Sequence, residues 1–217
     1  MSTRTTIIVA LVMIVAATLV GLALWNRLPD PMASHWDAND QVNGYISRFW
    51  GVFLMPLMTT GLVLFFLAIP RIDPLRANIA AFREAFNLFI VLFAGFMTYI
   101  YFLTLLWNLG YTGFNMSSAM LPALGVLYFF LGYLLRKAKR NFFIGIRTPW
   151  TLSSDHVWDE THRVGSVLFM IAGVLAFLGA FVGGTAAVWF LMAPLLASVL
   201  VTLVYSYVLY QREIKAS

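Results

Sequence analysis

The stretch from Thr5 to Trp25 reads TTIIVALVMIVAATLVGLALW and contains no charged side chain. About 20 apolar residues in a helix cross the ~30 Å hydrocarbon layer of a bilayer, so this stretch is long enough to span a membrane. It is also longer than the ~7–15-residue apolar core of a cleavable signal peptide, so we expect a retained anchor. This segment therefore makes a membrane protein the first expectation.

Five further stretches have the same apolar character. They are Phe49–Ile69, Phe86–Trp107, Ser118–Leu135, Gly165–Val182 and Ala186–Tyr210. The 217 residues are 61% hydrophobic and 11% charged, whereas a soluble domain is ~45–50% apolar and ~25% charged. A lone segment in lipid must satisfy its own backbone hydrogen bonds, as a helix does. We therefore predict an all-α integral membrane protein with six transmembrane helices in the cell membrane.

Basic residues are distributed unevenly among the predicted loops. With the N-terminus inside, twelve of the fourteen Lys and Arg residues lie on the cytoplasmic side, and only Arg27 and Arg48 lie outside. Such an excess of cytoplasmic Lys and Arg is the usual sign of orientation. An odd number of spans would export Arg212 and Lys215. We therefore predict that both termini are cytoplasmic.

Two predicted loops are long enough to carry function. The division that follows from them is an N-terminal two-helix unit, residues 1–70, with the extracellular loop 26–48, and a four-helix unit, residues 71–217, with the cytoplasmic loop 136–164. Together these units make one membrane domain. No convincing internal repeat is present, so the inverted-repeat architecture of transporters has no support.

The predicted spans contain no Asp, Glu, Lys, Arg or His. Because ionisable residues inside a membrane usually mark ion or proton paths, proton-coupled transport loses support. With no cysteine, a disulfide framework and thiolate chemistry are excluded. We expect no catalytic residue, no cofactor and no metal. A small permease or lipid-handling protein without ion coupling stays open, with Pro56 and Pro194 either as flexible points or as structural kinks.

The predicted fifth span carries a row of small residues. Ala172, Ala176, Ala180 and Gly184 follow one another at four-residue spacing, which places them on one helix face. Small residues let a second membrane helix approach closely. We therefore expect tight helix packing along this row.

The outer loop, 26–48, is rich in turn-forming residues. Pro29 and Pro31 stiffen the exit from the first span, and Asn43-Gly44 predicts a turn with positive φ. A compact folded loop is therefore expected rather than a slack linker.

Three polar residues of this loop raise the question of a metal. His35, Asp37 and Asp40 carry imidazole and carboxylate groups, which ligate several divalent cations. Three candidates on one turn-rich loop are a weak constellation. A hydrogen-bonded cap over the helix ends is the favoured alternative.

The inner loop, 136–164, opens with a basic cluster of Arg136, Lys137, Lys139 and Arg140. At a membrane exit, each such cation gains about 1 kcal/mol from anionic headgroups. We therefore expect contact with membrane lipids and no direct binding of nucleic acid.

A helix is predicted to start later in this loop. Ser153 or Ser154 followed by Asp155 is a typical N-cap, and the helix can continue into the fifth span.

Acidic and basic residues on this helix have spacings that allow local pairs. His156 can pair with Glu160, and Asp159 with His162 or Arg163. The spacing does not match the two-histidine zinc-protease motif, and no nucleophile accompanies it.

The inner loop carries a long ordered motif. It consists of Asn141, then Gly145-Ile146-Arg147-Thr148-Pro149-Trp150-Thr151-Leu152, then Val157-Trp158, then Thr161-His162-Arg163. This motif resembles the SdpI family of bacterial membrane immunity and signalling proteins. Its aromatic and rigid residues exceed what a membrane connector needs, so partner binding is a reasonable hypothesis.

The outer loop carries a second match. Leu28-Pro29-Asp30, His35-Trp36, Asn43-Gly44-Tyr45 and Ser47-Arg48 are similar to the uncharacterised N-terminal domain that often accompanies the family. One departure is Asp40, where this motif commonly has glycine.

The resemblance implies protection of a producing cell from a secreted peptide toxin and, in some members, signalling by recruitment of a cytoplasmic transcriptional repressor. The candidate residues for partner binding in the cytoplasm are Asn141, Gly145, Arg147, Thr148, Pro149, Trp150, Trp158, His162 and Arg163. Those for ligand binding outside are Pro29, Asp30, His35, Trp36, Gly44 and Tyr45.

Overall fold

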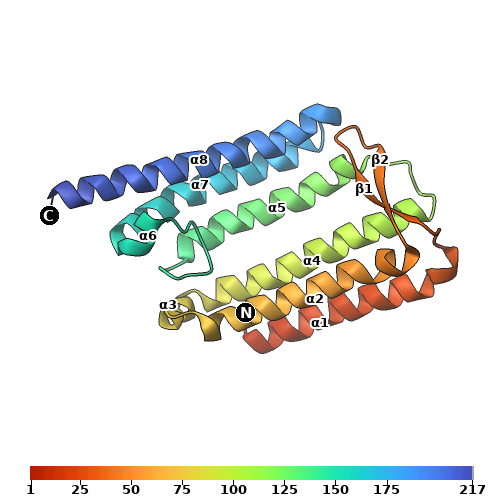
Figure 1. The fold of residues 1–217 in the computed structure, drawn as a ribbon, viewed down its shortest axis with the longest axis horizontal. Coiled ribbons are helices and arrows are strands. Elements are labelled where there is room, and N and C mark those ends of the chain that lie inside the picture. The colour runs from red at the N-terminus through yellow and green to blue at the C-terminus, as the bar shows by residue number, and fades with distance from the viewer. Residues whose placement is uncertain (217) are drawn as a thin grey trace.

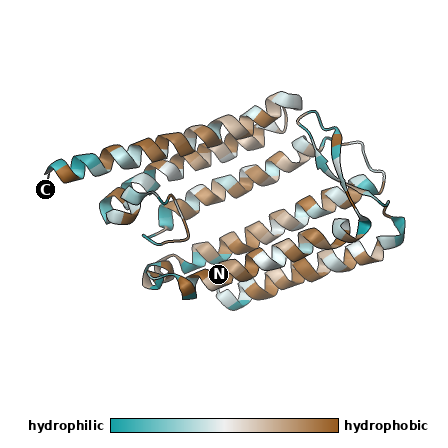
Figure 2. Ribbon diagram, viewed as in Figure 1, coloured by the Kyte–Doolittle hydropathy of each residue, from teal (hydrophilic) through white to brown (hydrophobic). Residues whose placement is uncertain are grey.

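The computed structural model describes residues 1–216 as a bundle of long helices with a hairpin at one end (Figure 1). The long helices are α1 (Thr3–Ala23), α2 (Arg48–Ile72), α4 (Arg83–Asn108), α5 (Met116–Lys137), α7 (Asp155–Gly179) and α8 (Gly184–Ala216). Within residues 1–216, these six helices are long and apolar enough to cross a membrane. In Figure 2, apolar residues cover the helices and hydrophilic residues gather at the ends. The predicted six transmembrane helices are confirmed.

Short elements distinguish the two ends of the bundle. A 3₁₀ turn (Trp25–Arg27) and the antiparallel strands β1 (Met32–Trp36) and β2 (Val42–Ile46) form what we call the hairpin end. The helices α3 (Arg76–Ala81) and α6 (Pro149–Ser153), with the rest of segment 136–163, form the signature end (Figure 1). The prediction of an all-α protein therefore needs one correction, because the outer loop contains a small sheet.

Both chain ends lie at the signature end. The Asn87 amide donates to the Met1 carbonyl at 3.0 Å, and the Ser154 hydroxyl donates to the Glu213 carboxylate at 2.8 Å. An even number of crossings requires this arrangement. Which side of the membrane this end faces stays a prediction.

The helices form two groups (Figure 1). Helix α4 packs on α1 and α2, while α7 packs most extensively on α5 and then on α8. Contacts between α4 and α5 join the two groups. The predicted division of the chain at residue 70 stays a prediction.

Glycines allow α5 and α7 to approach at backbone distance. A Cβ added at Gly125 would lie 2.6 Å from the Gly173 carbonyl oxygen, and one added at Gly132 would lie 2.6 Å from the Ser166 carbonyl oxygen. Backbones of membrane helices come this close only where side chains are small. The glycines at this contact therefore let the backbones of α5 and α7 pack closely together.

The predicted row of small residues is only half correct. Ala172 and Ala176 are fully buried, as expected. Helix α7 ends at Gly179, however, so Ala180 and Gly184 do not continue the row. The chain turns here because Gly183 and Gly184 adopt φ values of +73° and +58°, which glycine accepts without steric cost.

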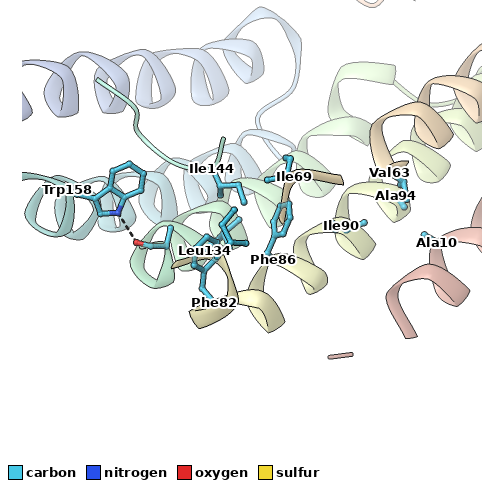
Figure 3. Close-up of a cluster of buried hydrophobic side chains, with 12 residues drawn as sticks. Ala10, Val63, Ile69, Phe82, Phe86, Ile90, Ala94, Leu134, Ile144 and Trp158 are labelled. Atoms are coloured by element: carbon cyan, nitrogen blue, oxygen red, sulfur yellow. Dashed lines mark hydrogen bonds between the residues drawn. The ribbon is translucent and has the colours of Figure 1, made fainter. Parts of the chain in front are cut away.

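One apolar cluster links the first helix group to the signature end (Figure 3). It includes Val63 of α2, Phe86 and Ile90 of α4, and Leu134 of α5, and it reaches Trp158 of α7. Because Trp158 is fully buried in this cluster, the signature end is anchored in the main core of the bundle.

Candidate functional site

Asn141 organises the loop that precedes α6. Its side chain is fully buried, and its amide nitrogen donates to the carbonyls of Lys139 and Ile144, both at 2.8 Å. Its amide oxygen accepts from the N–H groups of Phe143 and Ile144 at 2.9 and 2.6 Å. Two donated and two accepted bonds use the full capacity of an asparagine side chain. Asn141 is therefore committed to holding the loop.

Trp158 and His162 form the centre of the signature end. The Trp158 indole N–H donates to the Ala138 carbonyl at 2.9 Å (Figure 3). The His162 ring stacks on the Trp158 ring, with centroids 4.0 Å apart and planes 17° apart. Both side chains are buried.

The hydrogen bonds of His162 specify its tautomer. Its Nε2 accepts the Ile146 N–H at 3.0 Å, while Nδ1 lies 2.8 Å from the Trp158 carbonyl oxygen. Because a carbonyl oxygen only accepts, Nδ1 carries the proton and the ring is neutral. A structural role for His162 follows, since neither ring nitrogen is left for a ligand.

Gly145 is required by this packing. It has φ +117°, a conformation that L side chains rarely adopt. A Cβ at this position would clash with His162 Nε2 and approach Trp158 Cζ2 to 3.2 Å.

Helix α6 is held against α8. Thr148 and Thr151 form a capping box, with the Thr151 N–H donating to Thr148 Oγ1 at 3.1 Å and the Thr148 N–H donating to Thr151 Oγ1 at 2.9 Å. The Thr148 hydroxyl also donates to the Ser206 hydroxyl oxygen at 3.2 Å. The Trp150 ring packs on the Tyr207 ring at a centroid distance of 5.1 Å.

Only part of the predicted cytoplasmic set faces outward. Arg147, Pro149 and Arg163 are exposed. Arg147 donates to the Phe142 carbonyl at 2.6 Å, and Arg163 pairs with Glu160. These three residues are the ones that a partner can reach, whereas Asn141, Thr148, Trp158 and His162 are buried.

The start of α7 is confirmed, but its predicted charge pairs are wrong. Ser154 is the N-cap, accepting the Val157 N–H at 3.2 Å. Asp159 pairs with Lys139 at 3.2 Å rather than with His162 or Arg163, because His162 lies on the buried face of α7. Glu160 pairs with Arg163 rather than with His156.

Sequence reasoning missed Asp73. This carboxylate is only 2% exposed and accepts the N–H groups of Leu75 at 2.6 Å and Phe142 at 2.9 Å. It therefore ties the connector after α2 to the signature loop. The one available signal was an aspartate followed by Pro74 in an otherwise basic stretch, which is typical of a structured turn.

At the hairpin end, the turn lies earlier in the chain than the predicted turn at Asn43-Gly44. Asn43 and Gly44 belong to β2, and neither has a positive φ. The reversal occurs over Asp37–Gln41, where the Asp37 N–H donates to the Gln41 carbonyl at 2.9 Å. Asp37 Oδ1 stabilises it by accepting the N–H groups of Asn39 and Gln41 at 2.8 and 3.0 Å.

Asp40 takes the conformation that a glycine would take. Its φ is +60°, which explains why similar sequences can carry glycine here, and aspartate is among the few other residues that tolerate it. Its carboxylate also accepts the Ser117 N–H at 2.7 Å, in the first turn of α5. The hairpin is thereby fastened to the second helix group.

Two further ties hold the hairpin to the first helix group. The Asn108 side chain donates to the Ala33 carbonyl at 2.9 Å and accepts the Ala33 N–H at 2.7 Å, as a neighbouring strand would. Asp30 accepts the Arg48 N–H at 3.2 Å, and Arg48 Nε donates to the Pro29 carbonyl at 3.4 Å. The predicted Pro29 and Asp30 thus hold the start of α2.

The hairpin covers a cavity of about 280 Å³ above α2, α4 and α5. Its walls include His35 and Trp36 of the hairpin, Trp50 of α2, and Met116 and Met120 of α5. Gly44 lies beneath His35, because a Cβ there would be 2.8 Å from the His35 Cβ. Tyr45 is 61% exposed and does not line the cavity. The structure thus joins His35 and Trp36 with residues that sequence reasoning did not select for this site.

No metal centre is formed by the residues that the structure describes, 1–216. His35, Asp37 and Asp40 do not converge as a ligand set there. The two aspartates instead accept backbone N–H groups, which agrees with the cap alternative.

Comparison with known proteins finds a family match near each end of the chain. Residues 137–206 match the SdpI/YfhL protein family, and residues 12–60 match a domain of unknown function, DUF1648. Immunity protein SdpI of Bacillus subtilis (strain 168) is 26% identical over 208 residues, covering 94% of this chain and 96% of that protein. No solved structure matches. The resemblance found in the sequence is confirmed, and the chain is a multi-pass protein of the cell membrane.

Proposed function

We propose that this chain, which carries the SdpI/YfhL family match, is an immunity protein that protects a cell membrane from a secreted antimicrobial peptide. The observation that carries the proposal is the likeness to Immunity protein SdpI over 94% of the chain and 96% of that relative. A likeness of this extent includes both the hairpin end and the signature end. It leaves no large part of either chain to supply a separate function.

The geometry offers a physical route to such protection. A peptide that attacks the bilayer gathers at its surface, because it buries an apolar face among the headgroups. The hairpin end carries a preformed cavity beside exposed aromatic side chains such as Trp50. Binding there would sequester the peptide before it disrupts the bilayer. This route needs neither a chemical step nor a cofactor, so we expect no catalytic activity.

The test is protection of a sensitive bacterium. Cells that express the chain are exposed to a panel of secreted amphipathic peptides, and killing and membrane depolarisation are measured. We expect survival with at least one peptide, and unchanged killing by all of them at a verified membrane level would overturn the proposal. An Arg147→Ala variant tests whether protection also needs the exposed face of the signature end.

We further propose that this exposed face recruits a cytoplasmic transcriptional repressor. Arg147 follows Ile146, whose N–H binds His162, and Arg163 follows His162 itself, so both arginines are attached to the buried centre formed by Trp158 and His162. Alanine at Arg147 should lower recruitment of a tagged repressor to membranes without lowering the amount of the chain. Arg212→Ala, a basic change near the end of α8, is the matched control. Equal recruitment by both variants would contradict this role.

A lipid-handling or permease function is the second candidate. The observation in its favour is an apolar groove of about 690 Å³ between α7 and α8, lined in part by Pro194, Ala197 and Trp189. Lipid scrambling or solute flux in proteoliposomes tests it. Flux above that of protein-free liposomes, reduced by Ala197→Trp, would favour this function over immunity.

A further inference from the structure

The cavity at the hairpin end has the chemistry of a peptide-binding site. We infer that it receives an apolar side chain of a cationic amphipathic peptide lying at the membrane boundary. This inference deepens the proposed immunity function and rests on it. It assigns the position at which the peptide binds and the sign of the charge that the peptide must carry.

The cavity has room for a large side chain. Its volume is about 280 Å³, at the lower end of the ~300–1,000 Å³ of pockets that enclose drug-sized ligands. Met55, Met116 and Met120 supply much of the apolar wall. Methionine adapts to irregular apolar shapes and is frequent at surfaces that bind varied peptides. Such a wall fits an anchor residue whose shape is not fixed in advance.

The cavity is held open by polar ties on opposite sides. Asn108 binds the backbone of Ala33 on the α4 side, and Asp40 binds the backbone of Ser117 on the α5 side. The hairpin therefore cannot settle onto α2 and fill the space without breaking these bonds. A preformed site avoids part of the ordering cost of binding.

One hydrogen-bond donor in the cavity wall lacks an acceptor. The Trp36 indole N–H is buried and has no partner among residues 1–216. An unpaired buried donor is costly, so native proteins rarely keep one without a reason. The nitrogen itself has almost no accessible surface, so a peptide carbonyl supplies the missing acceptor when the Trp36 ring turns toward the cavity on binding.

The charges of the hairpin end select a cationic partner. Asp30, Asp37 and Asp40 accept backbone N–H groups but form no ion pair in the described chain, 1–216, where every ion pair lies at the signature end. Partner groups of like charge are disfavoured next to unpaired carboxylates, and cationic groups are attracted. These three aspartates outnumber Arg27 and Arg48, the two arginines of the same end, so the hairpin end favours a lysine-bearing peptide over an anionic lipid headgroup.

Photo-crosslinking of the full chain tests this site. Benzoylphenylalanine replaces Trp50, an aromatic residue of the cavity wall that is 50% exposed, or, as a control, Phe181, which is 77% exposed in the turn between α7 and α8 at the same end. The protein is placed in phosphatidylcholine nanodiscs with a synthetic amphipathic peptide of leucine and lysine, or with its leucine and glutamate counterpart. We expect crosslinks to the lysine peptide from position 50 well above those from position 181, and few to the glutamate peptide. Equal yields from both positions, equal yields with both peptides, or crosslinks from position 50 to lipid alone would overturn the inference.

Two variants test the same site by affinity. Trp36→Phe keeps the ring face but removes the N–H, so binding of the lysine peptide should weaken roughly two- to tenfold, as expected for one hydrogen bond. Met120→Trp fills the cavity and should weaken binding further. Tyr111→Phe, a change at a residue that is 65% exposed and lies outside the cavity, should bind as the wild type does. Unchanged affinity in both cavity variants would contradict the assignment.

The two proposals can fail separately. If the wild-type chain protects cells but the peptide does not crosslink at position 50, the cavity assignment is wrong and immunity stands. If the peptide binds there but no secreted peptide is resisted, the immunity function is wrong and the cavity is a peptide site with another purpose.

Discussion

The hairpin end and the signature end use the same residue types in opposite ways. At the signature end, Trp158 has an acceptor for its indole N–H, and both ring nitrogens of His162 are hydrogen-bonded. At the hairpin end, Trp36 has no acceptor among the described residues, and His35 is exposed at a cavity with one ring nitrogen, Nδ1, hydrogen-bonded to the Asn43 side chain. Paired polar groups in a packed core specify a rigid structure, and at the signature end the exception among the described residues next to His162 is the buried Thr161 hydroxyl. The difference teaches that the signature end is a rigid structural support, which we call the frame, whereas the hairpin end has the groups to bind a ligand.

The largest expected effect comes from breaking the frame at Trp158. Truncation of a buried tryptophan to alanine typically costs about 3–5 kcal/mol, because it leaves a cavity and here also an unpaired Ala138 carbonyl. Denaturant unfolding in detergent micelles should show this loss for Trp158→Ala. Trp189→Ala, which changes a side chain that is 65% exposed, should unfold like the wild type. Similar losses of unfolding free energy in both variants would contradict the structural role of Trp158.

A smaller loss is expected at Asn141. Asn141→Ala removes four hydrogen bonds in a buried loop, and part of the exposed backbone groups can be rehydrated, so we expect destabilisation of about 1–3 kcal/mol. Asn115→Ala is the matched control, because this exposed N-cap residue of α5 forms no side-chain capping bond. The same unfolding assay compares them. A neutral Asn141→Ala would show that the loop is held by packing alone.

The hairpin's attachment to α5 can be tested at Asp40. Asp40→Ala should lose about 1 kcal/mol for the cap and about 1 more for a β-carbon residue at positive φ. Asp40→Gly should avoid the cost of the positive φ but still lose the bond to the Ser117 N–H. Asp40→Asn should have a stability close to that of the wild type, because its side-chain oxygen is still an acceptor. Limited proteolysis of the hairpin, read with unfolding, ranks the three variants. An order in which alanine is the mildest change would refute this explanation.

The smallest stability effect should come from Trp36→Phe. Because the Trp36 N–H has no partner among residues 1–216, its removal breaks no bond; relief of the unpaired donor offsets the lost ring packing, and we expect a net change within about 0.5 kcal/mol. The paired change Trp158→Phe does break a bond and should cost at least about 1 kcal/mol. Thermal unfolding of the two variants side by side measures the difference. Equal losses would mean that Trp36 is bonded after all.

Features set by local sequence were predictable, and features set by distant partners were not. The apolar stretches identified the spans, and Ser154 with Asp155 identified the start of α7. The roles of Asp73 and Asn108 depend on backbone groups far along the chain, so no local pattern reveals them. The hairpin turn was misplaced because Asn43-Gly44 is the stronger local signal, while the carboxylate of Asp37 decides the actual turn.

The same reasoning explains the outcome for the candidate site. The sequence marked His35 and Trp36, but the cavity also needs Trp50, Met116 and Met120 from α2 and α5, which only the folded bundle brings together. Conversely, Trp158 and His162 are residue types that are common in binding sites, but here both side chains are buried and stack on each other. Residue type alone does not distinguish residues that support the structure from residues that bind a ligand.

The most direct test of the account compares protection by two variants at the hairpin end. Sensitive cells expressing the wild type, Met120→Trp or Tyr111→Phe are exposed to secreted amphipathic peptides, and membrane depolarisation is recorded at matched protein levels. The account predicts that the wild type and Tyr111→Phe preserve the membrane potential against at least one peptide, while Met120→Trp does not. Equal protection by all three would contradict the role of the cavity, and depolarisation equal to that of cells lacking the chain would contradict the immunity function itself.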